Sequence, residues 1–160
     1  MSLEESSRGS NSKQAARLEI ALELPSDLRL IEAVVSYLVG RCRASSFEGP
    51  RLDLNFRVGV TEALANAVLY GNENDPDKTI RVEFALDALR VEVRVIDEGP
   101  GFDPAAVPDP TTPERLESPS GRGIFLIRNL MDELEFNEAG NALRMVLDRQ
   151  VATTRAGSAP

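Results

Sequence analysis

Two polar side chains on one predicted helix have the types and the spacing that phosphoryl transfer requires. Glu62 and Asn66 stand four residues apart, so on a helix they share one face. The amide oxygen of Asn66 is a hard, neutral ligand suited to Mg²⁺, which keeps most of its waters and takes further ligands from nucleotide phosphates. Glu62, one turn away, could then orient or deprotonate an attacking hydroxyl. A Glu-x-x-x-Asn pair by itself is more often a solvated helix face, so its meaning depends on the motifs that accompany it.

An aspartate followed by two glycines ends a predicted strand. Asp97 stands at the strand end, and Gly99 and Gly101 can adopt backbone angles that are closed to other residues. In a nucleotide site, Asp97 could accept a hydrogen bond from an exocyclic amino group such as N6 of adenine, and Gly101 would let the base approach the backbone closely. A simple tight turn explains the two glycines about equally well.

A glycine pair opens the last predicted helix. The sequence Gly121-Arg122-Gly123 stands where free backbone N–H groups and the positive end of the helix dipole favour anions. Ser120 and Arg122 are close enough in sequence to add donors to a bound phosphate. Taken alone, the pair could equally be a cap and hinge. It is not a dinucleotide fingerprint, because Leu126 occupies the third glycine position and no parallel βαβ unit surrounds it.

Composition excludes several other kinds of chemistry and partner. The chain has no histidine, which removes Ser/His and Cys/His nucleophilic pairs, His-ligated zinc and a phosphohistidine intermediate on this chain. Its net charge of -8 disfavours nucleic acid and anionic membranes as direct partners. No run of 18 apolar residues is present and the first seventeen residues are polar, so we expect a cytoplasmic protein.

Periodicity predicts the scaffold that positions these motifs. Strands are predicted where apolar and polar residues alternate, and helices where apolar residues recur every three and four positions. In order, these are a strand over 18–24, helices over about 28–38 and 52–70, strands over 80–86 and 89–95, a helix over 124–134, and strands over 135–137 and 143–147. This order predicts an α+β fold, a two-layer sandwich with helices on one face of a mostly antiparallel sheet.

Length and local composition predict the domain organisation. The 160 residues suffice for one core, which we place at 18–150 between disordered tails at 1–17 and 151–160. The stretch 98–120 contains six prolines and no periodic pattern. Long irregular segments in compact domains are usually functional, so we expect this one to be a lid.

The ordered set of motifs resembles the N, G1 and G2 boxes of the GHKL ATPases and kinases, which share the Bergerat ATP-binding fold. The sequences of these boxes are most similar to those of the anti-sigma-factor serine/threonine kinases; they read TEALANAVLYGN, DEGPGFDP and SGRGIFLIRNLMDEL. The resemblance covers residues 18 to 149. It implies a GHKL ATP-binding kinase domain that uses ATP and Mg²⁺ as cofactors.

The resemblance also implies roles for individual residues. Glu62 matches the catalytic base and Asn66 the magnesium ligand, while Asp97 matches the adenine contact. The four glycines of the later boxes match those that shape the base pocket and the phosphate-binding lid: Gly99, Gly101, Gly121 and Gly123. One departure concerns a threonine that many members keep near the start of the last strand. Asn141-Ala142 stands there, which implies a looser or water-mediated adenine contact.

Partners follow from the resemblance alone. Family members bind a sigma factor, usually as homodimers, and phosphorylate a serine or threonine of an anti-sigma antagonist. The leading interpretation is therefore a serine/threonine protein kinase that regulates transcription as an anti-sigma factor. The first alternative is a nucleotide-gated module that binds a sigma factor or a phosphatase regulator without phosphorylating it. The second is a slow ATPase that serves a larger assembly.

Overall fold

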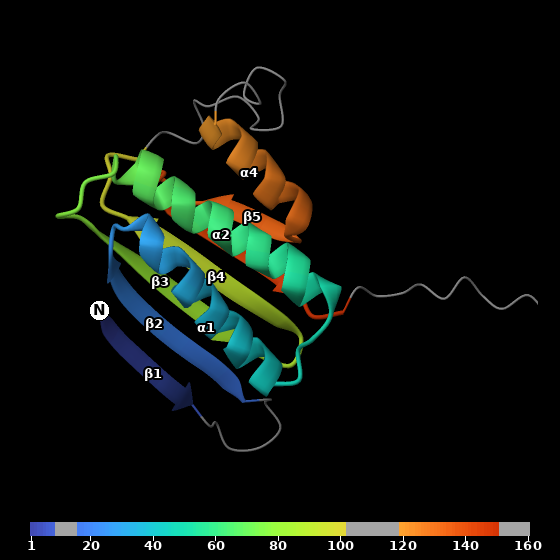
Figure 1. Cartoon of the computed structure of the whole chain (residues 1–160). Helices are drawn as coiled ribbons and strands as arrows, with labels where there is room; N and C mark the ends of the chain where they lie inside the picture. The colour runs from blue at the N-terminus through green and yellow to red at the C-terminus, as the bar shows by residue number, and fades with distance from the viewer. Residues whose placement is uncertain (9–15, 102–118, 151–160) are drawn as a thin grey trace, which may run out of the picture.

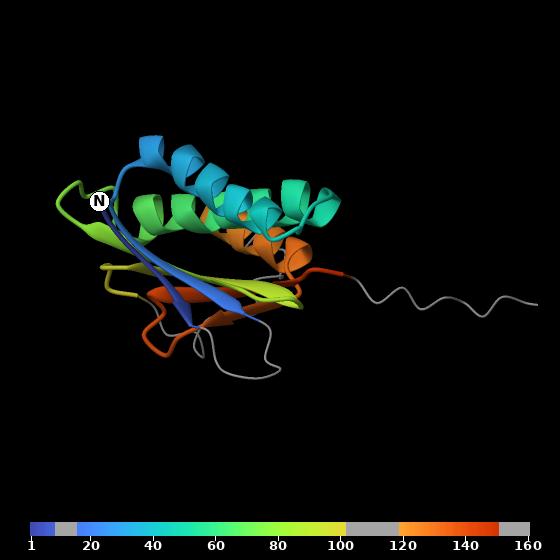
Figure 2. The ribbon, with the colours of Figure 1, turned by 90° about the horizontal axis from the view of Figure 1, so that it is seen from below.

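The computed structural model describes residues 1–8, 16–101 and 119–150. In these residues one antiparallel sheet of six strands carries three α-helices on one face, while the other face is open (Figures 1 and 2). The elements in chain order are β1 (Ser2–Arg8), β2 (Arg17–Pro25), α1 (Ile31–Ala44), α2 (Arg57–Asn66), β3 (Thr79–Leu86), β4 (Arg90–Asp97), α4 (Pro119–Leu130), β5 (Glu133–Phe136) and β6 (Ala142–Asp148). The predicted α+β sandwich is confirmed.

The sheet has the spatial order β1-β2-β3-β4-β6-β5, and each neighbouring pair is antiparallel. Its helix-facing side follows from the alternation of apolar residues, because successive side chains of a strand point to opposite faces. In β3, the even positions from Ile80 to Leu86 are buried and the residues between them are more exposed. The register continues this layer across the sheet, with Val82 opposite Leu22 on one side and Val95 on the other.

The core lies between this face and the helices. Leu38 of α1 and Leu64 of α2 are fully buried, and the ring of Phe56 meets that of Phe84 edge to face at 6.4 Å between centroids. Burying one such leucine contributes about 1.5–3 kcal/mol to stability. Widened π-helical turns at Arg51–Phe56 and Ala67–Gly71 extend α2 at both ends. The packing therefore fixes a long central helix whose last turn reaches the ends of β3 and β4.

The expected disorder of residues 1–17 is wrong for Ser2–Arg8, which form the edge strand β1. This strand pairs with β2 from Ser2 opposite Glu23 to Arg8 opposite Arg17. Glu5 contacts α1, where it accepts hydrogen bonds from Arg41 at 2.6 Å and from Tyr37 at 3.2 Å. The composition of β1 is polar and serine-rich, so it gives no strand signal. Pairing with β2 and the contacts of Glu5 override that local preference.

Other boundaries also differ from the predictions or fall outside the described residues. Helix α4 begins at Pro119, two residues before the glycine pair, and it ends at Leu130, so Leu134 lies in β5 instead of in the helix. Proline suits the first position of a helix, where its missing N–H has no partner to lose. Most of the expected lid, residues 102–118, and the expected tail at 151–160 lie outside the described residues. None of the described helices has the length and apolar character needed to span a membrane.

Candidate nucleotide site

Asp97 occupies a confined position where β4 ends. Its Oδ1 accepts a hydrogen bond from the backbone N–H of Gly99 at 2.8 Å, and its own N–H donates to the carbonyl oxygen of Asn141 at 2.9 Å. Burial raises the pKa of the Asp97 carboxyl above its usual range, and the Gly99 hydrogen bond and the positive charge of Lys78 partly offset this effect. The half-buried carboxylate is thus an acceptor that gains from a new donor.

Three glycines near Asp97 stand where any side chain would collide with neighbouring atoms. A Cβ atom on Gly71 would lie 2.3 Å from Oδ2 of Asp97, and one on Gly99 would lie 1.9 Å from the carbonyl oxygen of Gly71. Gly101 has φ +68°, and a Cβ there would lie 1.9 Å from the carbonyl oxygen of Ala139. Glycine is therefore required at positions 99 and 101 because the backbone approaches other atoms closely there. At Gly101 the positive φ is a second reason.

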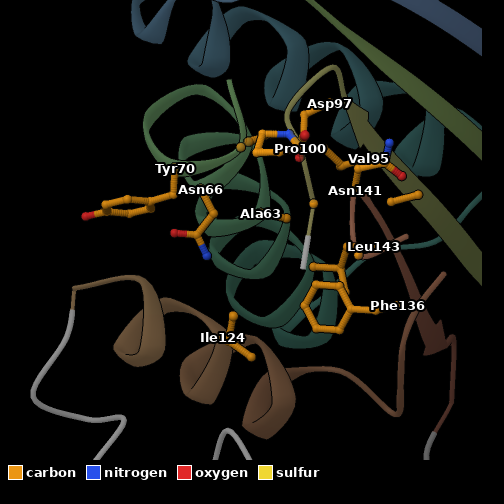
Figure 3. A pocket seen from close by; sticks show the side chains of 15 residues that line it. Ala63, Asn66, Tyr70, Val95, Asp97, Pro100, Ile124, Phe136, Asn141 and Leu143 are labelled. Atoms are coloured by element: carbon orange, nitrogen blue, oxygen red, sulfur yellow. The ribbon is translucent and has the colours of Figure 1, made fainter. Parts of the chain in front are cut away.

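A cavity of about 190 Å³ extends from Asp97 to Asn66 between α2, α4 and the sheet. Figure 3 shows Asp97 and Pro100 at one side of it, Ile124 of α4 at the opposite side, and Asn66 and Tyr70 along α2. The volume is below the roughly 300–1,000 Å³ of pockets that enclose a whole drug-sized ligand. The cavity therefore has room for one part of a nucleotide, and an acceptor at Asp97 suits the base.

Glu62 and Asn66 meet α4 at Gly123. A Cβ on Gly123 would lie 3.0 Å from Nδ2 and 3.2 Å from Oδ1 of Asn66, and 3.3 Å from Oε2 of Glu62. The carboxylate and the amide are thus brought to one point, as their helical spacing predicts. The same point is the N-terminal half of α4, where the helix dipole favours a phosphate. The three sequence motifs therefore converge on one region of the molecule.

The remaining predicted residues lie around the start of α4. Gly121 is buried and Arg122 is exposed, while Ser120 is in the first turn of the helix. Arg122 does not line the cavity. The predicted contribution of Ser120 and Arg122 to phosphate binding stays a prediction, and so do the roles of Glu62, Asn66, Asp97 and the four glycines.

Asn55, in the π-helical turn before α2, contacts the other end of α4. Its Nδ2 donates to the carbonyl oxygen of Leu130 at 2.8 Å, which satisfies one of the last carbonyl groups of that helix. We expect Asn55→Ala to lower the free energy of unfolding by about 1 kcal/mol, measured by urea denaturation. As a control, Asn129→Ala removes a bond from the exposed Asn129 to Phe125 within α4 and should cost less. Equal losses in the two variants would contradict this role.

Comparison with known proteins decides the family. A sequence model of the histidine kinase-like ATPase domain matches residues 24–147. The chain belongs to the histidine kinase-like ATPase family. These are the GHKL proteins, and the matched region contains each of the residues that the three boxes contribute to the site.

The curated relatives include anti-sigma factors and a serine kinase. The chain is 33% identical over 98 residues to "Anti-sigma F factor" of Clostridium beijerinckii, covering 59% of this chain and 68% of that protein. It is 37% identical over 93 residues to "Anti-sigma F factor" of Heyndrickxia coagulans, covering 54% and 63%. It is 29% identical over 98 residues to "Serine-protein kinase RsbW" of Oceanobacillus iheyensis, covering 58% and 62%. The matched segments thus span about two thirds of these relatives' lengths.

The residues of the site fit the ATP that a GHKL domain implies. At the base end, an acceptor carboxylate stands among glycines whose missing side chains leave a cradle that a Cβ would fill. At the phosphate end, Asn66 offers a neutral oxygen of the kind that Mg²⁺ accepts beside phosphate oxygens and water. Within residues 1–8, 16–101 and 119–150, no group of three or more histidine, cysteine or acidic side chains could hold a metal ion.

Several residues that line this GHKL pocket, among them Gly71, Phe136 and Leu143, were not identified from the sequence. Gly71 directly follows the helix predicted over 52–70, and its missing side chain makes room for Asp97. Phe136 and Leu143 line the cavity from β5 and β6, and Asn141 lines it from the turn between them. Asn141 is held by Asn137, whose Nδ2 donates to its Oδ1 at 2.7 Å. Ala142 lines the cavity at the position where many members have threonine.

Proposed function

We propose that this protein is an ATP-dependent serine/threonine protein kinase that acts as an anti-sigma-type regulator and phosphorylates an anti-sigma antagonist. The observation that carries the proposal is the meeting of Glu62 and Asn66 at Gly123, beside a cavity that ends at Asp97. The names of the relatives support the choice of partner, because they include anti-sigma F factors and a serine-protein kinase. We further propose that the protein works in the cytoplasm as a homodimer and binds a sigma factor.

In this proposal each residue has a limited task. Asp97 accepts a hydrogen bond from the exocyclic amino group of the base, and the glycines around it admit the base to the backbone. Asn66 is the protein's ligand to magnesium, which when bound neutralises charge on the phosphates. Glu62 orients the partner's serine or threonine hydroxyl and accepts its proton as the oxygen bonds to the γ-phosphorus and ADP departs. Positioning dominates such a reaction, so a small domain suffices.

The test is transfer of radiolabelled γ-phosphate from Mg·ATP to the antagonist protein. We expect Glu62→Gln to lower the labelling rate by about 10²–10⁴-fold, the usual contribution of a positioned acid or base, with little change in ATP affinity. Glu48→Gln is the matched control, because Glu48 is exposed on the loop before α2 and lies outside the cavity lining. Full labelling by Glu62→Gln would contradict the role of Glu62.

A nucleotide-gated binding module is the second candidate, and Ala142 in the base pocket is the observation that favours it. A pocket without the threonine hydroxyl offers the base one polar contact fewer, so we expect weaker ATP binding and faster release of nucleotide. This function predicts ATP-dependent complex formation with the partner and no phosphoprotein. A slow ATPase would instead release phosphate without any protein acceptor. The labelling experiment identifies the kinase, because only the kinase transfers label to serine or threonine. Release of free labelled phosphate then separates the ATPase from the binding module.

A further inference from the structure

A closed ring of hydrogen bonds lies directly behind Asp97. Asn72 follows the last turn of the central helix. Its Nδ2 donates to the carbonyl oxygen of Thr79 at 3.0 Å, and its Oδ1 accepts from the backbone N–H of Glu98 at 2.8 Å. The carboxylate of Glu98 completes the ring by accepting from the N–H of Thr79 at 2.6 Å and from its hydroxyl at 3.2 Å. The ring therefore joins the helix end, the start of β3 and the residue after β4.

Asn72 is fully buried, at 0% exposure, although it stands in a connection between two elements. Among the described residues, Ser26 is the other buried polar side chain. A buried amide is costly unless its donor and acceptor are both satisfied. Asn72 meets that condition only because two separate segments, at Thr79 and Glu98, present a carbonyl and an N–H at the same time. The Asn72 side chain thus holds these two segments at a fixed distance from each other.

The backbone after Asn72 is held in a conformation that side chains disfavour. Glu73 has φ +53° and Asn74 has φ +58°, so two successive non-glycine residues lie in the left-handed region. The chain reverses here, and the N–H of Asn74 reaches the carbonyl oxygen of Val68 at 2.8 Å. Such conformations persist where the surrounding structure enforces them, often next to a functional site. The strained reversal keeps Asn72 directed at β3 and β4.

The residues next to Asn72 and Glu98 are packed so closely that they have little room to move. Gly71 precedes Asn72, and Gly99 follows Glu98. The two glycines approach so closely that a Cβ on Gly99 would lie 1.9 Å from the carbonyl oxygen of Gly71, while a Cβ on Gly71 would lie 2.3 Å from Oδ2 of Asp97. A shift of a few tenths of an ångström between the helix end and the strand end would therefore move the Asp97 carboxylate.

We propose that Asn72 is a positioning residue for base recognition: its amide sets the spacing between the helix end and the strand end, and so aims the Asp97 carboxylate at the exocyclic amino group of a purine. Asn72 does not line the cavity, so it acts through Asp97 and does not touch the nucleotide. The inference rests on the proposed nucleotide function. In this inference the hydrogen-bonded ring of Asn72, Thr79 and Glu98 determines which base is bound, because the ring sets the position of Asp97.

The test compares ATP with inosine triphosphate, which carries a carbonyl oxygen where adenine has its amino group. Calorimetric titration of the full chain should show the wild type binding ATP about tenfold or more tightly than inosine triphosphate, the value of a hydrogen bond to a charged group. In Asn72→Ala this ratio should fall toward one, chiefly through weaker ATP binding. A purely structural role would weaken both nucleotides by the same factor and keep the ratio, which would overturn the proposal.

A second pair of variants keeps the proposal testable if Asn72→Ala does not fold. Glu98→Ala breaks the exposed side of the ring and should also lower the ratio, whereas Glu98→Gln keeps an acceptor oxygen for Thr79 and should restore it. Asn129→Ala, on the exposed face of α4, should leave the ratio unchanged. A wild type that binds neither nucleotide removes the proposed function and this inference together. A wild type that prefers ATP, with the same ATP-to-inosine-triphosphate ratio in Asn72→Ala and in Glu98→Ala, overturns this inference alone.

Discussion

Asp97→Asn will weaken ATP binding while leaving the fold at least as stable. The carboxylate is the acceptor for the exocyclic amino group, and a hydrogen bond to a charged group is worth about 1.5–3 kcal/mol, so affinity should fall by about 10- to 150-fold. Asparagine has nearly the same shape and can still accept from the Gly99 N–H, so the turn at the end of β4 should persist. Calorimetry gives the affinity, and thermal unfolding gives the stability.

The stability part of this prediction follows from the direction of the Asp97 pKa shift. Burial raises the folded-state pKa of the Asp97 carboxyl above its ordinary value of 3.8. The carboxyl therefore favours folding below pH 3.8, and this contribution is lost as pH rises through the raised pKa. At pH 7 the ionised, half-buried group opposes folding, and the neutral asparagine does not. The melting temperature of Asp97→Asn at pH 7 should therefore equal or exceed that of the wild type.

Asp87→Asn is the control for this experiment. Asp87 lies at the opposite end of the same hairpin, where its Oδ1 accepts from the N–H groups of Leu89 and Arg90 at 2.8 and 3.0 Å. Asparagine can accept both bonds, and the site is remote from the cavity, so nucleotide affinity should not change. Unchanged ATP affinity in Asp97→Asn would show that the base is not held by this carboxylate.

Gly123→Ala should slow phosphoryl transfer by about 100-fold while the chain still folds. Replacing a helical glycine by alanine stabilises a helix by about 0.5–1 kcal/mol. The new Cβ would lie 3.0 Å from Nδ2 of Asn66 and 3.3 Å from Oε2 of Glu62, so both side chains would have to move. A misplacement approaching 1 Å can cost about 100-fold in rate. We therefore expect labelling of the partner to fall by about that factor.

Gly40→Ala is the matched control, because Gly40 is also in a helix, α1, and a Cβ there would meet nothing within 4 Å. It should show the full gain in stability from helix propensity, with unchanged labelling. The comparison separates helix propensity from steric contact at the site. Equal activity in the two alanine variants would mean that the convergence of Glu62 and Asn66 at Gly123 has no part in the reaction.

The strands that could be predicted from the sequence are those in which apolar and polar residues alternate along the strand itself. Alternation from Ile80 to Leu86 identified β3 and its buried face, because one side of that strand packs against the helices. Strand β1 carries no such alternation: Leu3 is 54% exposed, and the strand exists through backbone pairing with β2 and the contacts of Glu5. Those interactions join residues that are far apart in the chain, and no local pattern encodes them.

The same distinction applies to the site. Glu62 and Asn66 share a helix face, and Gly123 is part of a short glycine motif, so each could be identified from its neighbours in sequence. Gly71 and Phe136 enter the pocket through tertiary structure. The resemblance placed Asn141 near the adenine contact, and the structure gives the reason: the pairing of β4 with β6, with Val95 opposite Leu143, places the turn at Asn141 next to Asp97. No local pattern of residues encodes that register.

The edge strand has a practical consequence for anyone who expresses the domain alone. The family match begins at residue 24, so a protein trimmed to 24–147 would lose β1 and nearly all of β2. The N–H and C=O groups of β3 that pair with β2 would then be open to water and to other chains, and Val82 and Phe84 would lose their cover from Leu22 and Ile20. Open, apolar strand edges recruit further strands and aggregate. Soluble expression therefore calls for the whole N-terminal segment, with any affinity tag placed at the other end of the chain.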